Sequence, residues 1–150
     1  MTNEYETPTP HEPESQDTGD ERHPRRTAEA FMEYCVQHAP TEEFAETYWE
    51  LYRVAGDAFA AYLTLEDINS ASETLAADFD NVYVGGFASE AAVVDNELNM
   101  LGWTDAIDRV ISRQGIPEGV VTWNHGAMFT HLQNVYDIVP LGGYFYVFNK

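Results

Sequence analysis

Between Ala28 and Arg113 the sequence holds 17 aspartate and glutamate residues but only three cations, Arg53, Arg109 and Arg113, so this stretch carries a net charge of −14. The acids stand between aromatic and aliphatic residues at helical spacing, and a folded chain therefore fixes them in space against their mutual repulsion. A solvated tail would lack those apolar neighbours. We interpret the stretch as a folded acidic surface that serves a partner.

The chain as a whole has a formal net charge of −19 and is 44% hydrophobic over 150 residues, enough for a core in one or two units. Nucleic acids and anionic lipids are bound by clustered lysine and arginine, so we expect no direct nucleic-acid or membrane binding and a basic partner instead. The single cysteine, Cys35, excludes an intramolecular disulfide and leaves no thiol cluster for zinc. No apolar run is long enough to span a bilayer, and the acidic N-terminus is unlike a signal peptide, so we expect a cytoplasmic protein.

Composition divides the chain into three predicted segments. Residues 1–27 contain four of the seven prolines and seven acids, and we predict a disordered acidic tail there. Residues 28–77 carry helical periodicity and form a predicted helical domain, whereas residues 78–150 mix strand and helix signals. We therefore predict an α+β fold, in which a small helical domain precedes an α+β domain whose three-stranded antiparallel sheet ends in a C-terminal hairpin.

Local signals mark the helices of the first domain. An apolar stripe predicts a first helix that ends at Pro40; its members are Ala30, Phe31, Tyr34, Cys35 and His38. Thr41 is the predicted N-cap of the next helix, which Gly56 kinks or breaks. The run from Ser70 to Glu73 has the form of a capping box and predicts a short helix over Ser72–Ala77.

The second half begins with a β-prone run from Asn81 to Val84, which Gly85 and Gly86 are expected to end. Three further helices are predicted, with N-caps at Ser89, Thr104 and Asn124. The chain closes with a predicted hairpin, which turns at Pro140 to Gly143 and is apolar on both faces.

From Ala28 onwards, several short motifs occur in a fixed order. They are the run from Phe79 to Ser89, the run from Ile116 to Glu118, Trp123, Phe129, and the run from Gly142 to Phe148. In their order and spacing, over roughly four-fifths of the chain, these motifs resemble the middle and C-terminal parts of the ArdA antirestriction proteins.

ArdA proteins are acidic DNA mimics that inhibit type I restriction–modification enzymes. The resemblance implies a helical middle domain, an α+β C-terminal domain, a homodimer, and a surface that occupies the DNA groove of the enzyme's specificity subunit. The sequence departs from the family in two ways. No counterpart of the family's N-terminal α+β domain precedes Ala28, and no carboxylate lies between Glu118 and Asp137, where family members often carry acids.

Two rows of phosphate-mimicking carboxylates are predicted as the partner-binding surface. The first row, on the helix after Thr41, contains Glu42, Glu43, Glu46, Glu50 and Asp57. It has about one charge per 4 to 5 Å, which approaches the spacing of about 3.4 Å along one strand of B-DNA. A duplex has two strands, so a second row or a second subunit is needed. The second row is predicted from Glu66, Asp67, Glu73, Asp78, Asp80, Glu90, Asp95, Glu97, Asp105 and Asp108.

No catalytic residue, metal site or cofactor is predicted. His125 and His131 are six residues apart, whereas a spacing of four places two ligands on one helix face, and no larger ligand cluster joins them to Asp137. Asp95 and Glu97 are two residues apart and belong to different helix faces, so they make a poor acid–base pair. The sequence predicts a binding protein and no enzyme.

Two other interpretations of the acids stay open at this point. A carboxylate-rich helix face is commonly a solvated surface without a partner. An acidic module of this kind also fits a different basic DNA-binding protein as its target. Only the family resemblance separates the second alternative from antirestriction.

Overall fold

A computed structural model describes residues 23–150, and their side chains from residue 27 onwards. Within this range the chain forms seven helices and one three-stranded antiparallel sheet, which confirms the predicted α+β class. In chain order the elements are α1 (His23–Gln37), α2 (Glu42–Ala55), α3 (Asp57–Leu63), α4 (Leu75–Val82), β1 (Tyr83–Phe87), α5 (Glu90–Met100), α6 (Trp103–Gln114), α7 (His125–Val135), β2 (Tyr136–Leu141) and β3 (Tyr144–Asn149).

The C-terminal strand β3 lies between β1 and β2, and both of its pairings are antiparallel. β2 and β3 form the predicted hairpin. They are joined by Gly142 and Gly143, whose φ angles of 62° and 80° suit a two-residue turn. Pro140 belongs to β2 and not to the turn. An edge strand tolerates proline because its outer N–H groups need no partner strand.

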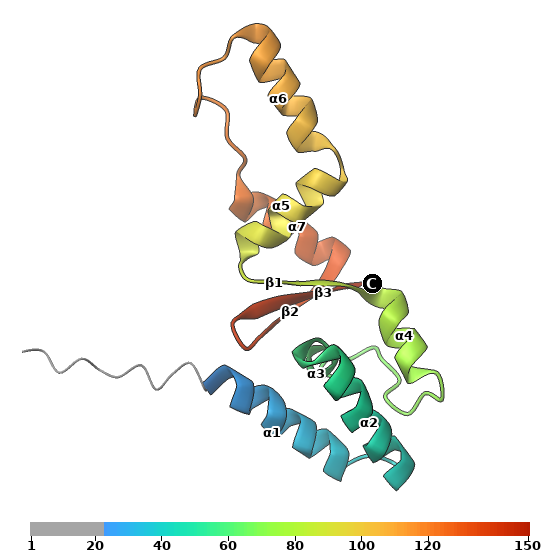
Figure 1. Cartoon of the computed structure of the whole chain (residues 1–150). Coiled ribbons are helices and arrows are strands. Elements are labelled where there is room, and N and C mark those ends of the chain that lie inside the picture. Colours follow the sequence, from blue (N-terminus) through green and yellow to red (C-terminus); the bar gives the residue numbers. More distant parts are fainter. Residues whose placement is uncertain (1–22) are drawn as a thin grey trace, which may run out of the picture.

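The sheet separates two hydrophobic clusters, one on each of its faces (Figure 1). Helices α1 to α4 supply the first cluster, which Tyr146 and Phe148 of β3 join. Helices α5 and α7 supply the second, which Phe145 and Val147 join. Successive residues of a strand point to opposite faces, so a strand between two helical layers is apolar throughout. This arrangement explains why the predicted hairpin is apolar on both faces.

Helix α1 differs from its prediction in where it begins and in which face it buries. It starts at His23, inside the segment predicted as a tail, and the rest of that tail lies outside the described residues. From residue 27 onwards, its fully buried residues are Ala28 and Met32. Three members of the predicted stripe are exposed instead: Ala30, Tyr34 and His38. Apolar and aromatic residues occupy more than one face of α1, so spacing alone does not decide which face packs against α2 and α3.

The segment around residue 80 also differs from its prediction. α4 covers Leu75–Val82, not Ser72–Ala77. The two glycines expected to end a strand lie inside β1, where Gly85 pairs with Val147 and Gly86 with Tyr146. A Cβ atom at Gly86 would lie 3.0 Å from Cε1 of Tyr146, so glycine lets that ring cover the strand. The partner strand therefore turns a predicted break into part of the sheet.

Most of the predicted helix boundaries are confirmed. The side chains of Thr41, Ser89 and Asn124 each accept a hydrogen bond from the backbone N–H three residues later, at 3.2, 3.0 and 3.0 Å. Gly56, at a φ of 64°, separates α2 from α3 as expected. The predicted cap at Thr104 is wrong, because Gly102 occupies the N-cap position of α6 and that helix has no side-chain cap.

Helix α6 and the segment that returns from it project from the rest of the molecule (Figure 1). We call residues 100–123 the arm. Where α6 begins and the return segment ends, Trp103 and Trp123 stack with ring centroids 6.5 Å apart. No residue of the arm is buried, so the arm adds nothing to either hydrophobic cluster beyond half-buried contacts.

Candidate partner-binding surface

Helix α2 has one face in the core and one in solvent. Tyr48 is buried, and its hydroxyl donates a hydrogen bond of 2.7 Å to the carbonyl oxygen of Ser70. Phe44 and Leu51 pack against the same hydrophobic cluster. These contacts hold α2 in a defined orientation, and its four glutamates lie on the exposed side.

The four glutamates form a row along the helix, which we call the α2 row: Glu42, Glu43, Glu46 and Glu50. At 1.5 Å per residue the row is about 12 Å long. Within residues 27–150, no lysine, arginine or histidine lies within ion-pair distance of these carboxylates. Glu42 and Glu43 stand in the first turn, where the helix dipole favours negative charge. The fold thus holds the row in place without neutralising it.

One acid of the predicted second row lies beside the α2 row. Glu73, in the segment before α4, lines a hollow of about 580 Å³ together with Glu43. Phe44, Thr47 and Leu75 line the same hollow. The fold therefore brings together two carboxylates from distant parts of the sequence.

A second hollow, of about 540 Å³, is lined by Asp67 and Asp78 together with Asp137 and Lys150. The Lys150 ammonium lies 3.9 Å from Oδ1 of Asp137, so this group of acids has a cation beside it. Asp137 was not among the predicted partner-binding residues. Its position could not be predicted from sequence spacing, because only the folded sheet brings β2 close to Asp67 and Asp78.

Asp57 does not continue the α2 row. It is the first residue of α3, and its Oδ1 accepts a hydrogen bond of 3.1 Å from the Tyr52 hydroxyl. Burial, followed by the negative charge of Asp57, raises the pKa of Tyr52 to about 12. Burial and the same carboxylate also raise the pKa of Tyr146 to about 12. The predicted row of five is therefore a row of four, and Asp57 belongs to a tyrosine cluster between α2, α3 and β3.

Asp78 stabilises the turn that precedes α4. Its Oδ2 accepts a hydrogen bond of 2.7 Å from the Ser72 hydroxyl, and its Oδ1 accepts one of 3.0 Å from the Thr74 hydroxyl. The Ser72 hydroxyl oxygen also accepts the backbone N–H of Thr74 at 3.2 Å. These bonds replace the predicted capping box, and they leave Asp78 less free to meet a partner.

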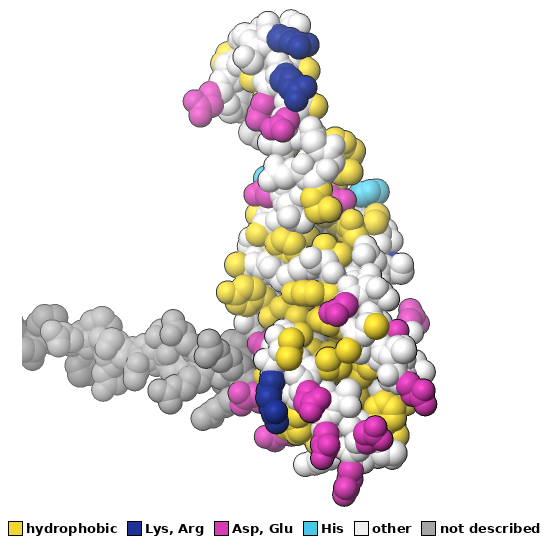
Figure 2. Space-filling view, turned by 45° about the vertical axis from the view of Figure 1, so that its right-hand side comes forward, with side chains coloured by type: hydrophobic (Ala, Val, Ile, Leu, Met, Phe, Trp, Pro, Cys, Tyr) yellow, Lys and Arg dark blue, Asp and Glu magenta, His cyan; other side chains and the backbone are white. Residues whose placement is uncertain are grey.

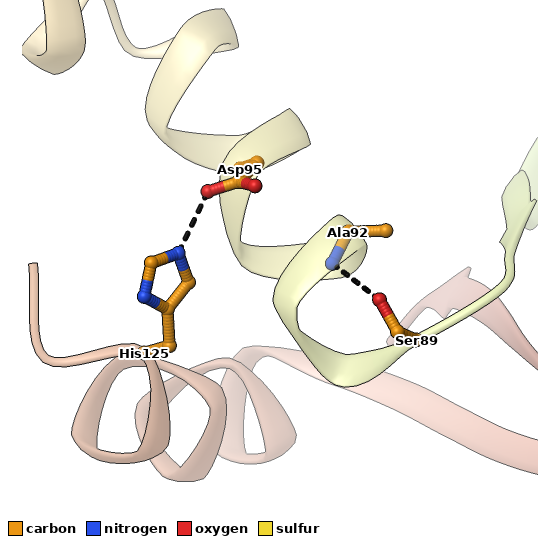
Figure 3. A network of polar contacts seen from close by, with 4 residues as sticks. All are labelled: Ser89, Ala92, Asp95 and His125. Carbon is orange, nitrogen blue, oxygen red and sulfur yellow. Dashed lines mark hydrogen bonds and ion pairs between the residues drawn. The ribbon is translucent and has the colours of Figure 1, made fainter.

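Asp95 and Glu97 of α5 likewise have partners inside the protein. Oδ1 of Asp95 lies 2.8 Å from Nε2 of His125, the first residue of α7 (Figure 3). The Tyr136 hydroxyl lies 3.2 and 3.3 Å from the two carboxylate oxygens of Glu97 and donates to them. The two acids therefore lie on different faces of α5, as predicted, and connect it to α7 and β2.

The other acids of the predicted second row are exposed and lie on separate elements. Glu66 precedes α4, Asp80 is in α4, Glu90 begins α5, and Asp105 and Asp108 are in α6. Figure 2 shows acidic side chains gathered on the end of the molecule away from the arm, with few on the arm itself. The predicted second row is thus spread over several elements, whereas the α2 row is continuous.

Comparisons with protein families, with curated proteins and with solved structures found no match. Among the described residues, no three His, Cys, Asp or Glu side chains converge as a metal site requires. In the same range, no helix combines the length and the apolar character that a bilayer crossing needs. Cys35 is half-buried, and burial raises the pKa of its thiol, which disfavours the reactive thiolate. The feature that bears most directly on function is the α2 row.

Proposed function

We propose that this protein is an antirestriction protein, a DNA mimic that occupies the DNA-binding groove of a type I restriction–modification enzyme. The observation that carries the proposal is the α2 row, four exposed carboxylates on one helix with no cation partner in the described chain. Anions held close together repel one another, and a basic groove relieves that repulsion. The resemblance to the ArdA proteins directs the proposal to type I enzymes.

The proposed mechanism is competition for the groove. The carboxylates stand where the phosphates of bound DNA would stand, and they contact the lysine and arginine side chains that hold DNA. Four charges over about 12 Å approach the density along one DNA strand, about one charge per 3.4 Å. A duplex presents two strands, so the row needs further anions, from Glu73 beside it and from a second copy of the chain. Binding releases counterions, so inhibition weakens as salt rises.

The test compares two variants that change the net charge equally. The first neutralises the α2 row with Glu42→Gln, Glu43→Gln, Glu46→Gln and Glu50→Gln. The matched control neutralises four exposed acids on other elements, Glu33→Gln, Asp80→Asn, Glu90→Gln and Glu118→Gln. An exposed ion pair contributes about 0.5 kcal/mol, so the first variant should inhibit about 30-fold more weakly than the wild type. The control should stay close to the wild type.

Inhibition is measured as the protein concentration that halves DNA cleavage by a purified type I enzyme at constant salt. Circular dichroism verifies that both variants are folded. If the two variants lose inhibition equally, the α2 row has no special role, and the net charge of the protein accounts for the loss. If the wild-type protein does not inhibit, and a pull-down recovers another DNA-binding protein, the target belongs to the alternative class of basic partners.

A further inference from the structure

Strand β3 carries a row of aromatic side chains that runs from solvent into the core. Alternation along the strand places Tyr144, Tyr146 and Phe148 on one face. Tyr144 is 50% exposed, Tyr146 is half-buried and Phe148 is fully buried. The rings of Tyr144 and Tyr146 stack with their centroids 6.3 Å apart. The outer end of the row is therefore an aromatic surface that a partner can reach.

Two further tyrosines lie beside this row. We call the four together the tyrosine patch: Tyr52, Tyr83, Tyr144 and Tyr146. A Cβ atom at Gly86 would lie 3.0 Å from the Tyr146 ring and 3.4 Å from the Tyr83 hydroxyl oxygen, so both side chains lie over the bare backbone of that glycine. Tyr52 of α2 lies near Tyr146: after burial and Asp57, the Tyr146 hydroxyl also raises the pKa of Tyr52. The patch therefore combines side chains from α2, β1 and β3.

The tyrosine patch surrounds a carboxylate that no cation of the described chain neutralises. Asp57 is half-buried, and its Oδ1 accepts the Tyr52 hydroxyl. Within residues 27–150, its Oδ2 has no hydrogen-bond donor, and no lysine, arginine or histidine lies within ion-pair distance. Exposed Glu29 of α1 adds a second negative charge near Tyr52. The patch therefore attracts a cation from outside the chain.

We infer that the tyrosine patch binds an arginine side chain of a basic partner. The guanidinium group is planar, so it stacks on a tyrosine ring while its N–H groups donate to a carboxylate. Tyr144 and Tyr146 supply the rings, and Asp57 beside Tyr146 supplies the acceptor. A lysine ammonium group is compact and strongly hydrated, and it gains less from the same rings. The patch thus distinguishes arginine from lysine.

Trp49 connects the tyrosine patch to the α2 row. Its ring centroid lies 6.0 Å from that of Tyr52, and it follows Glu46 by three residues, so the two are neighbours on the helix surface. One basic surface can therefore contact the row and the patch together. This inference deepens the proposed function and rests on it for the source of the arginine, which is the DNA-binding groove.

The first experiment compares two peptides of equal charge, hexaarginine and hexalysine. Isothermal titration calorimetry measures their Kd for the full chain at constant salt. The wild-type chain should bind hexaarginine about three- to fivefold more tightly, because only the guanidinium group stacks well on the rings. Tyr144→Leu removes the most exposed ring of the patch and should abolish most of this preference. Tyr34→Leu is the matched control: it removes a tyrosine of α1 that is 57% exposed and outside the patch, and it should keep the preference.

The variant with the α2 row neutralised separates this site from the proposed function. Loss of the four glutamates should raise the Kd of both peptides by the same factor, because the row attracts positive charge of either kind. The ratio of the two Kd values should stay that of the wild type.

The second experiment locates the bound peptide by nuclear magnetic resonance of the wild-type chain with isotope-labelled tyrosine rings. Hexaarginine should shift the ring signals of Tyr144 and Tyr146 and leave those of Tyr34 in place. Hexalysine at equal saturation should shift the patch signals less. Single Tyr→Phe substitutions assign the signals.

Three results would overturn the inference: a wild-type chain that shows no preference for hexaarginine, a folded Tyr144→Leu variant that keeps the full preference, or ring shifts that spare Tyr144 and Tyr146. Circular dichroism verifies the fold, and the ring shifts decide if Tyr144→Leu is unfolded. Neither experiment contains a restriction enzyme, whereas the proposed function is read from DNA cleavage. Failure of the arginine site is thus distinguishable from failure of the proposed function.

Discussion

The acidic region, residues 28–99, and the arm, residues 100–123, distribute charge and apolar surface in opposite ways. The acidic region contains 15 acids and one arginine, and its apolar residues make up much of the two hydrophobic clusters. The arm contains three acids and two arginines, and it leaves apolar residues exposed. Helices that use their apolar face to cover a sheet present only their polar face to a partner. Helix α6 projects from the sheet and leaves apolar side chains exposed.

This contrast gives the two regions different surface chemistry. An unpaired row of carboxylates attracts a basic surface and repels another copy of itself. Helix α6 contains two aspartates and two arginines and exposes apolar side chains, so it lacks the net negative charge of the α2 row. The predictions below test the contrast, from the largest expected effect to the smallest.

The largest expected difference is in the contribution of single side chains to stability. Phe59 of α3 is fully buried, and its ring lies against Tyr48, Tyr62 and Phe79. Phe59→Ala should lower the free energy of unfolding by about 3–5 kcal/mol, because it leaves a cavity. Val120→Ala in the arm should change it by less than about 0.5 kcal/mol. Urea denaturation measures the free energy of unfolding of both variants. Similar decreases would contradict the prediction that the arm is loosely packed.

The helix caps should differ between the two regions as well. The Thr41 side chain accepts a backbone hydrogen bond at the start of α2, and the Ser89 side chain accepts one at the start of α5. Thr41→Ala and Ser89→Ala should therefore each lower the free energy of unfolding by about 1 kcal/mol. Thr104→Ala in the arm should lower the free energy of unfolding by less than about 0.5 kcal/mol, because α6 has no side-chain cap. Thermal and urea unfolding check this. An equal loss of unfolding free energy in Thr104→Ala and Thr41→Ala would show that Thr104 does cap α6, as the sequence predicts.

Salt should stabilise the protein through the acidic region. The Debye length falls from about 30 Å at 0.01 M to about 8 Å at 0.15 M ionic strength, so repulsion within the α2 row is screened. The free energy of unfolding should rise by about 0.5 kcal/mol over this range, as expected for like charges at helical spacing. In the variant with the α2 row neutralised, the free energy of unfolding should rise less with ionic strength. An unchanged rise in that variant would assign the repulsion to other acids.

The smallest expected effect is the pH dependence of stability at high pH. It comes from tyrosines outside the arm, since the arm contains none. The pKa of Tyr52 is about 12 in the folded protein against an ordinary value of 10.0, so the folded state holds this proton more tightly. Its contribution to stability is fully present below about pH 10 and is lost as pH rises toward 12. Asp57→Asn removes a negative charge beside the hydroxyl and should lower that pKa. An ultraviolet titration of tyrosine absorbance, with Tyr52→Phe as the control, measures the shift; an unchanged pKa in Asp57→Asn would leave burial as its cause.

Interactions within a few residues were predictable from the sequence, and so were the features that depend on them. The N-caps at Thr41, Ser89 and Asn124 and the break at Gly56 each depend on one side chain or one backbone angle. The exposed α2 row follows from helical periodicity and the apolar residues between its glutamates. The α+β class and the C-terminal hairpin follow from the same local signals.

Only the tertiary structure decided the features that depend on distant residues. Pairing with β3 keeps Gly85 and Gly86 within β1, and packing against two other helices selects the buried face of α1. Contacts between elements also engage Asp57, Asp95 and Glu97, which no spacing in the sequence reveals. The apolar spacing of α6 is that of any helix in a core. The fold places this helix away from the sheet, so apolar side chains of α6 stay exposed to solvent.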